Sequence, residues 1–137
     1  MALAVISIGL VAILGLFPIG LTSANTASTS ILVSEIGQDI FATIRTQPFT
    51  KADLSNFYPT GGPYDLTTFS GTLTNYYTST GLETNGPYVA YYRVTLSFEP
   101  LPPLNLTKVQ AIIVWPSASL TPKNTNVFVS QIAQYDL

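Results

Sequence analysis

The chain has 137 residues and a net charge of −2, and only 9% of its residues are charged, against roughly 25% in an ordinary soluble protein. It contains neither cysteine nor histidine, which excludes disulfides, thiolate or imidazole metal sites, and nucleophilic catalysis that depends on histidine. Its five basic residues are scattered, so nothing indicates a nucleic-acid or polybasic lipid interface. We therefore expect one domain that is not an enzyme and holds no cofactor or metal.

The chain begins with an almost wholly apolar run, and residues 1–34 carry no charged side chain. About 20 apolar residues, at about 1.5 Å each, can cross a hydrocarbon core of about 30 Å. Three interpretations fit: a cleaved secretory signal, a permanent membrane anchor, or a helix that packs against copies of itself. A secretory signal begins with positive charge, whereas the first basic residue here is Arg45. We expect residues 1–25 to form an apolar helix buried in lipid or among other helices.

The helical pattern continues and becomes amphipathic over residues 26–47. Apolar residues recur every four positions, at Leu32, Ile36, Ile40 and Ile44. Gln47 and Pro48 end the pattern, because the residue before a proline is disfavoured in the helical conformation. This half of the helix therefore needs an apolar surface on one side only.

A section between Gly15 and Gly20 weakens the first half of the helix. Pro18 has no amide hydrogen for the preceding turn, and each glycine lowers helix propensity by about 1 kcal/mol. We predict that the helix breaks within this section in a tight assembly.

Residues 48–137 combine a turn-rich segment with strand patterns. Glycine and proline punctuate the first part, in which we expect one strand, and three further apolar patterns predict antiparallel strands beyond it. A stiff, proline-rich turn at residues 99–103 separates two of them. The expected strands are Thr67–Tyr77, Tyr88–Phe98, Thr107–Trp115 and Asn126–Gln134.

These patterns predict an α+β fold, in which a long N-terminal α-helix packs on a small antiparallel sheet of three to four strands. Both the second half of the helix and one face of the strands carry apolar stripes that need cover. The residues expected at this contact are Ile36, Ile40 and Ile44 on the helix and Tyr92, Val94, Ile113 and Trp115 on the sheet.

Two other features invite a functional interpretation. Asn105-Leu106-Thr107 matches an N-glycosylation sequon with Asn105 as the candidate acceptor, although such triplets also occur by chance. The tyrosines near Tyr88 and Tyr92 favour sheet packing and contact between subunits over a platform for ligand stacking.

The apolar sequence MALAVISIGLVAILGLFPIG resembles the interior of the N-terminal helix of type IV pilin-like proteins, in particular the PilV-like minor pilins and the matching pseudopilins of type II secretion. The stretches YVAYYRVTLSF and VQAIIVWP, followed by a short final strand, are similar to the closing sheet of those proteins. The resemblance implies the pilin fold, and it also implies a helix that melts near Pro18 during assembly.

One family feature is missing from this sequence. Family members begin with a short basic leader, a cleavage point after glycine, and a glutamate early in the mature chain, and none of these precedes Met1. On an alignment through Ala2-Leu3-Ala4, we expect Met1 to be internal and about seven mature residues, including the glutamate, to be missing.

The resemblance implies a structural subunit of a bacterial, extracellular filament of identical subunits. Such a subunit resides in the inner membrane before the pilus assembly machinery polymerises it. Two alternatives stay open: a minor pseudopilin of a type II secretion-like machine, and a membrane-anchored or secreted β domain that binds a partner. The expected filament-core residues are Leu3, Val5, Ile6, Ile8, Leu10, Ile13, Leu14 and Phe17.

Overall fold

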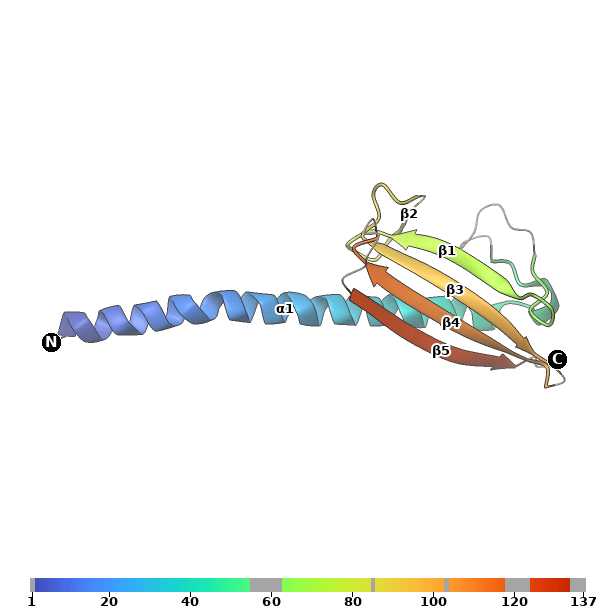
Figure 1. The fold of residues 1–137 in the computed structure, drawn as a ribbon, viewed down its shortest axis with the longest axis horizontal. Coiled ribbons are helices and arrows are strands. Elements are labelled where there is room, and N and C mark those ends of the chain that lie inside the picture. Colours follow the sequence, from blue (N-terminus) through green and yellow to red (C-terminus); the bar gives the residue numbers. More distant parts are fainter. Residues whose placement is uncertain (1, 55–62, 85, 103, 118–123, 134–137) are drawn as a thin grey trace. The chain divides into compact units, whose positions relative to one another are not determined.

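The computed structural model describes residues 2–54, 63–84, 86–102, 104–117 and 124–133 (Figure 1), and for residues 2–17 and 19 it describes the backbone alone. The chain divides into two compact units, Met1–Leu32 and Val33–Leu137. The first unit is helical, and the second holds the end of the helix and the sheet.

Helix α1 runs over Ala2–Thr46, with Pro18 inside it. It ends ahead of Gln47 and Pro48, as the sequence predicts. In the last turn the Thr46 hydroxyl donates to the carbonyl of Thr43 at 2.7 Å, and the amide of Gln47 donates to the carbonyl of Ile44 at 3.2 Å. These bonds satisfy carbonyl groups that a helix end otherwise leaves without partners.

The part of α1 that belongs to the second unit buries one side and exposes the other. Its buried residues are Val33, Ile36, Gly37, Ile40, Phe41 and Ile44. Glu35, Gln38 and Asp39 lie between them and are exposed. The buried positions follow the spacing of three and four residues that defines one face of an amphipathic helix.

Five antiparallel strands form one sheet in the order β2-β1-β3-β4-β5 (Figure 1). The predicted α+β class is confirmed, but the predicted number of three to four strands was wrong. The additional strand is β2, whose two residues are too few to produce an alternating pattern. The strands are β1 (Gly71–Tyr77), β2 (Glu83–Thr84), β3 (Tyr92–Leu101), β4 (Leu106–Trp115) and β5 (Asn124–Ala133), and a short 3-10 helix, η1, covers Phe49–Lys51.

Strand β1 begins at Gly71 rather than at Thr67, because residues 65–69 form a turn. The Asp65 carboxylate accepts hydrogen bonds from the amide of Thr67 at 2.9 Å and from its hydroxyl at 2.6 Å. The carbonyl of Asp65 accepts the amide of Phe69 at 2.8 Å. The two bonds from Thr67 hold the pKa of the Asp65 carboxyl below its ordinary value. An aspartate that binds the backbone just after it favours a turn over a strand.

Strand β3 begins at Tyr92 rather than at Tyr88, and it continues to Leu101 through residues that the sequence predicted as a turn. Pairing with β1 stops at Phe98, whereas pairing with β4 continues to Leu101. On its β1 side, Pro100 therefore has no neighbouring strand among the described residues. Its missing amide hydrogen costs no ladder bond there, which is why proline is tolerated at this position.

The last two strands begin slightly earlier than predicted. β4 starts at Leu106 rather than Thr107, and β5 starts at Asn124 rather than Asn126. The predicted end of the last strand, Gln134, lies outside the described residues.

The sheet has one buried face. Alternate residues of its three inner strands are aligned in register and buried, with the end of α1 against this face. On the opposite face, β5 exposes Val127 and Val129. The buried positions are Leu73, Asn75 and Tyr77 in β1, Tyr92, Val94, Leu96 and Phe98 in β3, and Thr107, Val109, Ala111 and Ile113 in β4.

Candidate assembly surfaces

The first candidate surface is the apolar segment of α1. All eight residues expected in a filament core, from Leu3 to Phe17, lie on this helix, but their side chains lie outside the described residues. Their role in assembly stays a prediction. Among the residues that the structure describes, no helix is long and apolar enough to cross a membrane.

Beyond Pro18 the helix carries a ladder of hydroxyl groups that bind its own backbone. The hydroxyl of Thr22 donates to the carbonyl of Pro18 at 2.9 Å, that of Thr26 to Thr22 at 2.9 Å, and that of Ser30 to Thr26 at 3.0 Å. The sequence analysis missed this ladder, although hydroxyl residues four positions apart are its visible signal. Because each hydroxyl has a partner on its own helix, this segment can enter apolar surroundings without leaving these donors unsatisfied.

The predicted break of the helix concerns the assembled state, and the isolated chain does not test it. In the single chain, α1 is helical on both sides of Pro18. A Cβ atom added at Gly20 would meet no atom within 4 Å, so no close contact in the single chain requires a glycine there. What Gly20 contributes locally is backbone freedom.

Residues expected at the helix–sheet contact are buried to different degrees. Ile36, Ile40 and Ile44 have at most 5% of their surface exposed, and Val94 and Ile113 are fully buried. Trp115 is only half-buried, with its ring centre 5.9 Å from that of Tyr92. These residues belong to the inner faces of the second unit, with Trp115 towards the rim.

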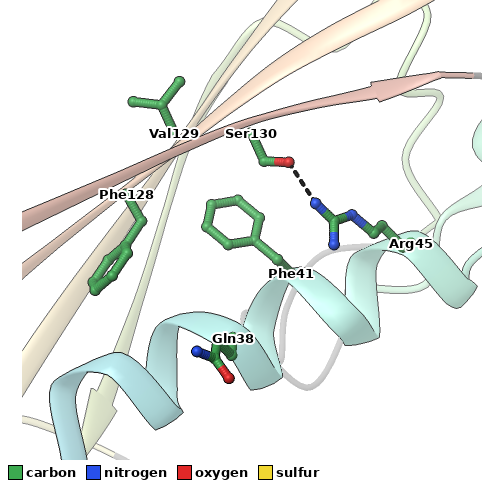
Figure 2. A pocket seen from close by; sticks show the side chains of 6 residues that line it. All are labelled: Gln38, Phe41, Arg45, Phe128, Val129 and Ser130. Carbon is green, nitrogen blue, oxygen red and sulfur yellow. Dashed lines mark hydrogen bonds between the residues drawn. The ribbon is translucent and has the colours of Figure 1, made fainter. Parts of the chain in front are cut away.

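Gly37 is part of this contact, and the sequence analysis did not single it out. A Cβ atom at this position would lie 3.1 Å from the ring of Phe128 in β5. Figure 2 shows the Phe128 ring directed towards the helix. A side chain at Gly37 would require the Phe128 ring to shift by a few tenths of an ångström, so glycine suits the close approach of β5 and α1 at this point.

A groove of about 410 Å³ lies between the end of α1 and strand β5 (Figure 2). Phe41 and Phe128 provide apolar walls, and the guanidinium of Arg45 donates a hydrogen bond to the Ser130 hydroxyl at 2.8 Å. Gln38 and Val129 complete the lining. The groove therefore combines two aromatic rings with one cationic group beside the edge of the sheet.

The candidate sequon lies in the connection between β3 and β4. Asn105 is exposed and has a φ of 48°, in the left-handed region that asparagine adopts more readily than most residues. The third sequon residue, Thr107, is fully buried, and its hydroxyl donates to the carbonyl of Leu66. Glycosylation of Asn105 stays a prediction, but in the folded chain the sequon hydroxyl faces the interior.

The charged side chains that the structure describes lie apart from one another, with a surface pair between two of them. No group of three or more carboxylate, histidine or cysteine residues gathers among them. An ion pair joins Lys108 to Glu99 at 3.0 Å across two strands at the surface, an arrangement that contributes little to stability.

No family model, curated protein or solved structure matches this chain.

Proposed function

We propose that the chain is a structural subunit of an extracellular type IV pilus-like filament, polymerising through its hydrophobic N-terminal helix. The observation that carries the proposal is the division of α1. Residues 33–46 bury one side in the sheet unit, whereas residues up to Leu32 form a separate unit. An uncharged helix that is apolar on all sides needs cover, because soluble proteins do not leave so large an apolar surface in water.

The described end of this first unit supports the same proposal. Leu21 and Ile31 have 51% and 60% of their surface exposed in the single chain. The self-bonded hydroxyls of Thr22, Thr26 and Ser30 and the small residues between them suit close contact between helices, where small side chains let backbones approach. Copies of the same helix would supply that cover in a filament.

Before assembly, the same apolar segment holds the subunit in the inner membrane in this proposal. The assembly machinery then withdraws it into the filament. The sheet unit, with its uncharged edge strand and few charged residues, lies outside the helical core and forms the filament surface.

The proposal is tested by placing a charge in the apolar segment. Ile13→Asp should abolish filaments, because a carboxylate buried without a partner costs several kcal/mol. Thr50→Asp, at an exposed position of the sheet unit, is the matched control and should assemble normally. Negative-stain microscopy of sheared surface material reports the yield of filaments for each variant.

Circular dichroism of the purified Ile13→Asp chain should show an intact sheet unit, which separates loss of assembly from loss of folding. Filaments of normal yield from Ile13→Asp would contradict the proposal.

A further inference from the structure

The sheet ends on one side in a strand that lacks the usual protection of an edge. β5 pairs with β4 along its ten residues, and no other strand of the described chain pairs with it. It contains no charged residue and no proline, two of the features that commonly block pairing at an exposed edge. The opposite edge strand, β2, has only two residues and carries Glu83. β5 therefore presents the long, neutral edge of this sheet.

The groove described above opens directly beneath this edge. Side chains alternate along β5: Val127 and Val129 are exposed on the outer face, while Phe128 and Ser130 point towards α1 (Figure 2). A strand added next to β5 would place every second side chain on the same side as Phe128 and Ser130. One such side chain would enter the groove beside Phe41, and the next would lie near Arg45.

The charge in this groove is not neutralised by the described part of the chain. Arg45 is exposed, and its guanidinium donates to the neutral Ser130 hydroxyl rather than to any described carboxylate. A guanidinium presents several donors in a planar fork that matches a carboxylate. The groove is thus complementary to an acidic side chain at one position and an apolar one two residues away.

We propose that β5 and the groove beneath it bind an extended, acid-bearing segment of a partner protein as an additional strand of the sheet. Backbone hydrogen bonds to β5 supply affinity, and the two alternate side chains supply specificity. An apolar side chain packs between Phe41 and Phe128, and a carboxylate pairs with Arg45. This role goes beyond polymerisation, because it gives each subunit its own docking site.

The positive charge of Arg45 favours a partner protein over a second copy of this chain as the strand that pairs with β5. Pairing β5 with β5 of another copy would bring no acidic residue to the groove, since the strand contains none. It would instead bring a second Arg45, so that two guanidinium groups would share the interface without a carboxylate. An acidic partner strand removes that conflict.

The test uses the full chain, purified in mild detergent, and a fluorescein-labelled probe peptide with blocked ends, TVTFTDTVT. This peptide puts Phe and Asp two residues apart on one face of a strand. Fluorescence anisotropy should show saturable binding. The same peptide with alternate backbone amides methylated, and the peptide TVTFTKTVT, should each bind at least about tenfold more weakly.

Two variants complete the test. Arg45→Gln should lower affinity for TVTFTDTVT by about tenfold, and Arg45→Glu should reverse the preference so that TVTFTKTVT binds more tightly. Circular dichroism checks that both variants fold. Absence of binding would overturn the proposal. Equal affinity for TVTFTDTVT, its methylated form and TVTFTKTVT would also overturn it. A dimer in sedimentation that Arg45→Glu disrupts would assign the edge to a second copy and would equally overturn it.

Discussion

At the residue scale, Thr107 joins the turn-rich segment to the sheet. Its side chain is fully buried in β4, and its hydroxyl donates to the carbonyl of Leu66, whose amide in turn donates to the carbonyl of Phe49 at 2.9 Å. This bond connects residues far apart in the sequence. It also explains why a hydroxyl residue is accommodated at a position whose partners in the neighbouring strands, Pro100 and Ile132, are apolar.

We expect Thr107→Val to destabilise the sheet unit by about 1–3 kcal/mol, because valine keeps the shape but leaves the buried Leu66 carbonyl without its donor. Thr125→Val, at an exposed position of β5, is the control and should change stability by less than about 0.5 kcal/mol. Urea unfolding followed by near-UV circular dichroism measures both. Equal effects of the two substitutions would contradict a structural role for this hydrogen bond.

The buried Tyr77 makes the stability of the sheet unit depend on pH in the alkaline range. Burial, assisted by the nearby negative charges of Glu83 and Asp39, raises the pKa of Tyr77 well above its ordinary value near 10. The unfolded chain therefore releases this proton at a lower pH than the folded chain does. The contribution of Tyr77 to stability is complete below about pH 10 and is lost as the pH rises above it.

We expect Tyr77→Phe to reduce the loss of stability as the pH rises above about 10, because phenylalanine has no proton to release. Tyr88→Phe is the matched control for loss of a tyrosine hydroxyl, because Tyr88 is fully exposed. The measurement is the unfolding midpoint as a function of pH. A profile for Tyr77→Phe identical to that of the parent chain would show that Tyr77 ionises alike in both states.

At the element scale, residue patterns predicted the large elements but not the close approaches between them. The end of α1 at Thr46 followed from Gln47 and Pro48, and four strands followed from apolar patterns, of which two alternate and one is apolar on both faces. Strand β2 could not be predicted, because two residues carry no period. Pro100 was assigned to a turn, since the sequence does not reveal that β1 stops pairing at Phe98.

The groove between α1 and β5 could not be predicted from the sequence either. The groove is lined by Phe41 of α1 and Phe128 of β5, and which residues of these two elements face each other is a property of the folded unit. In the sequence, Arg45 is only one of several scattered basic residues. Its position beside Ser130 required the three-dimensional arrangement.

The break in α1 is a prediction for this element in the filament. A proline inside a helix costs about 3 kcal/mol, and Gly15 and Gly20 add about 1 kcal/mol each, so the costs concentrate within one short section. We expect a filament map to show backbone without helical hydrogen bonds between Gly15 and Gly20. Unbroken helical bonding from Leu10 to Ala24 would contradict this prediction.

At the scale of the whole molecule, the chain consists of two units whose apolar surfaces differ in how they are covered. The sheet unit covers its own apolar face with the end of α1, whereas Leu21 and Ile31, at the described end of the first unit, are exposed in a single chain. Burial by copies of the same segment would join these units into one assembly with a helical core and a sheet surface.

The most direct test of this claim measures whether the apolar segment is buried in assembled material. Because the chain has no native cysteine, single variants Ile13→Cys and Thr50→Cys each provide one labelling site. In sheared filaments free of membrane, maleimide should label Thr50→Cys fully and leave Ile13→Cys almost unlabelled, and both should react after dissolution in denaturing detergent. Equal labelling of the two variants in intact sheared material would contradict burial of the segment among copies of itself.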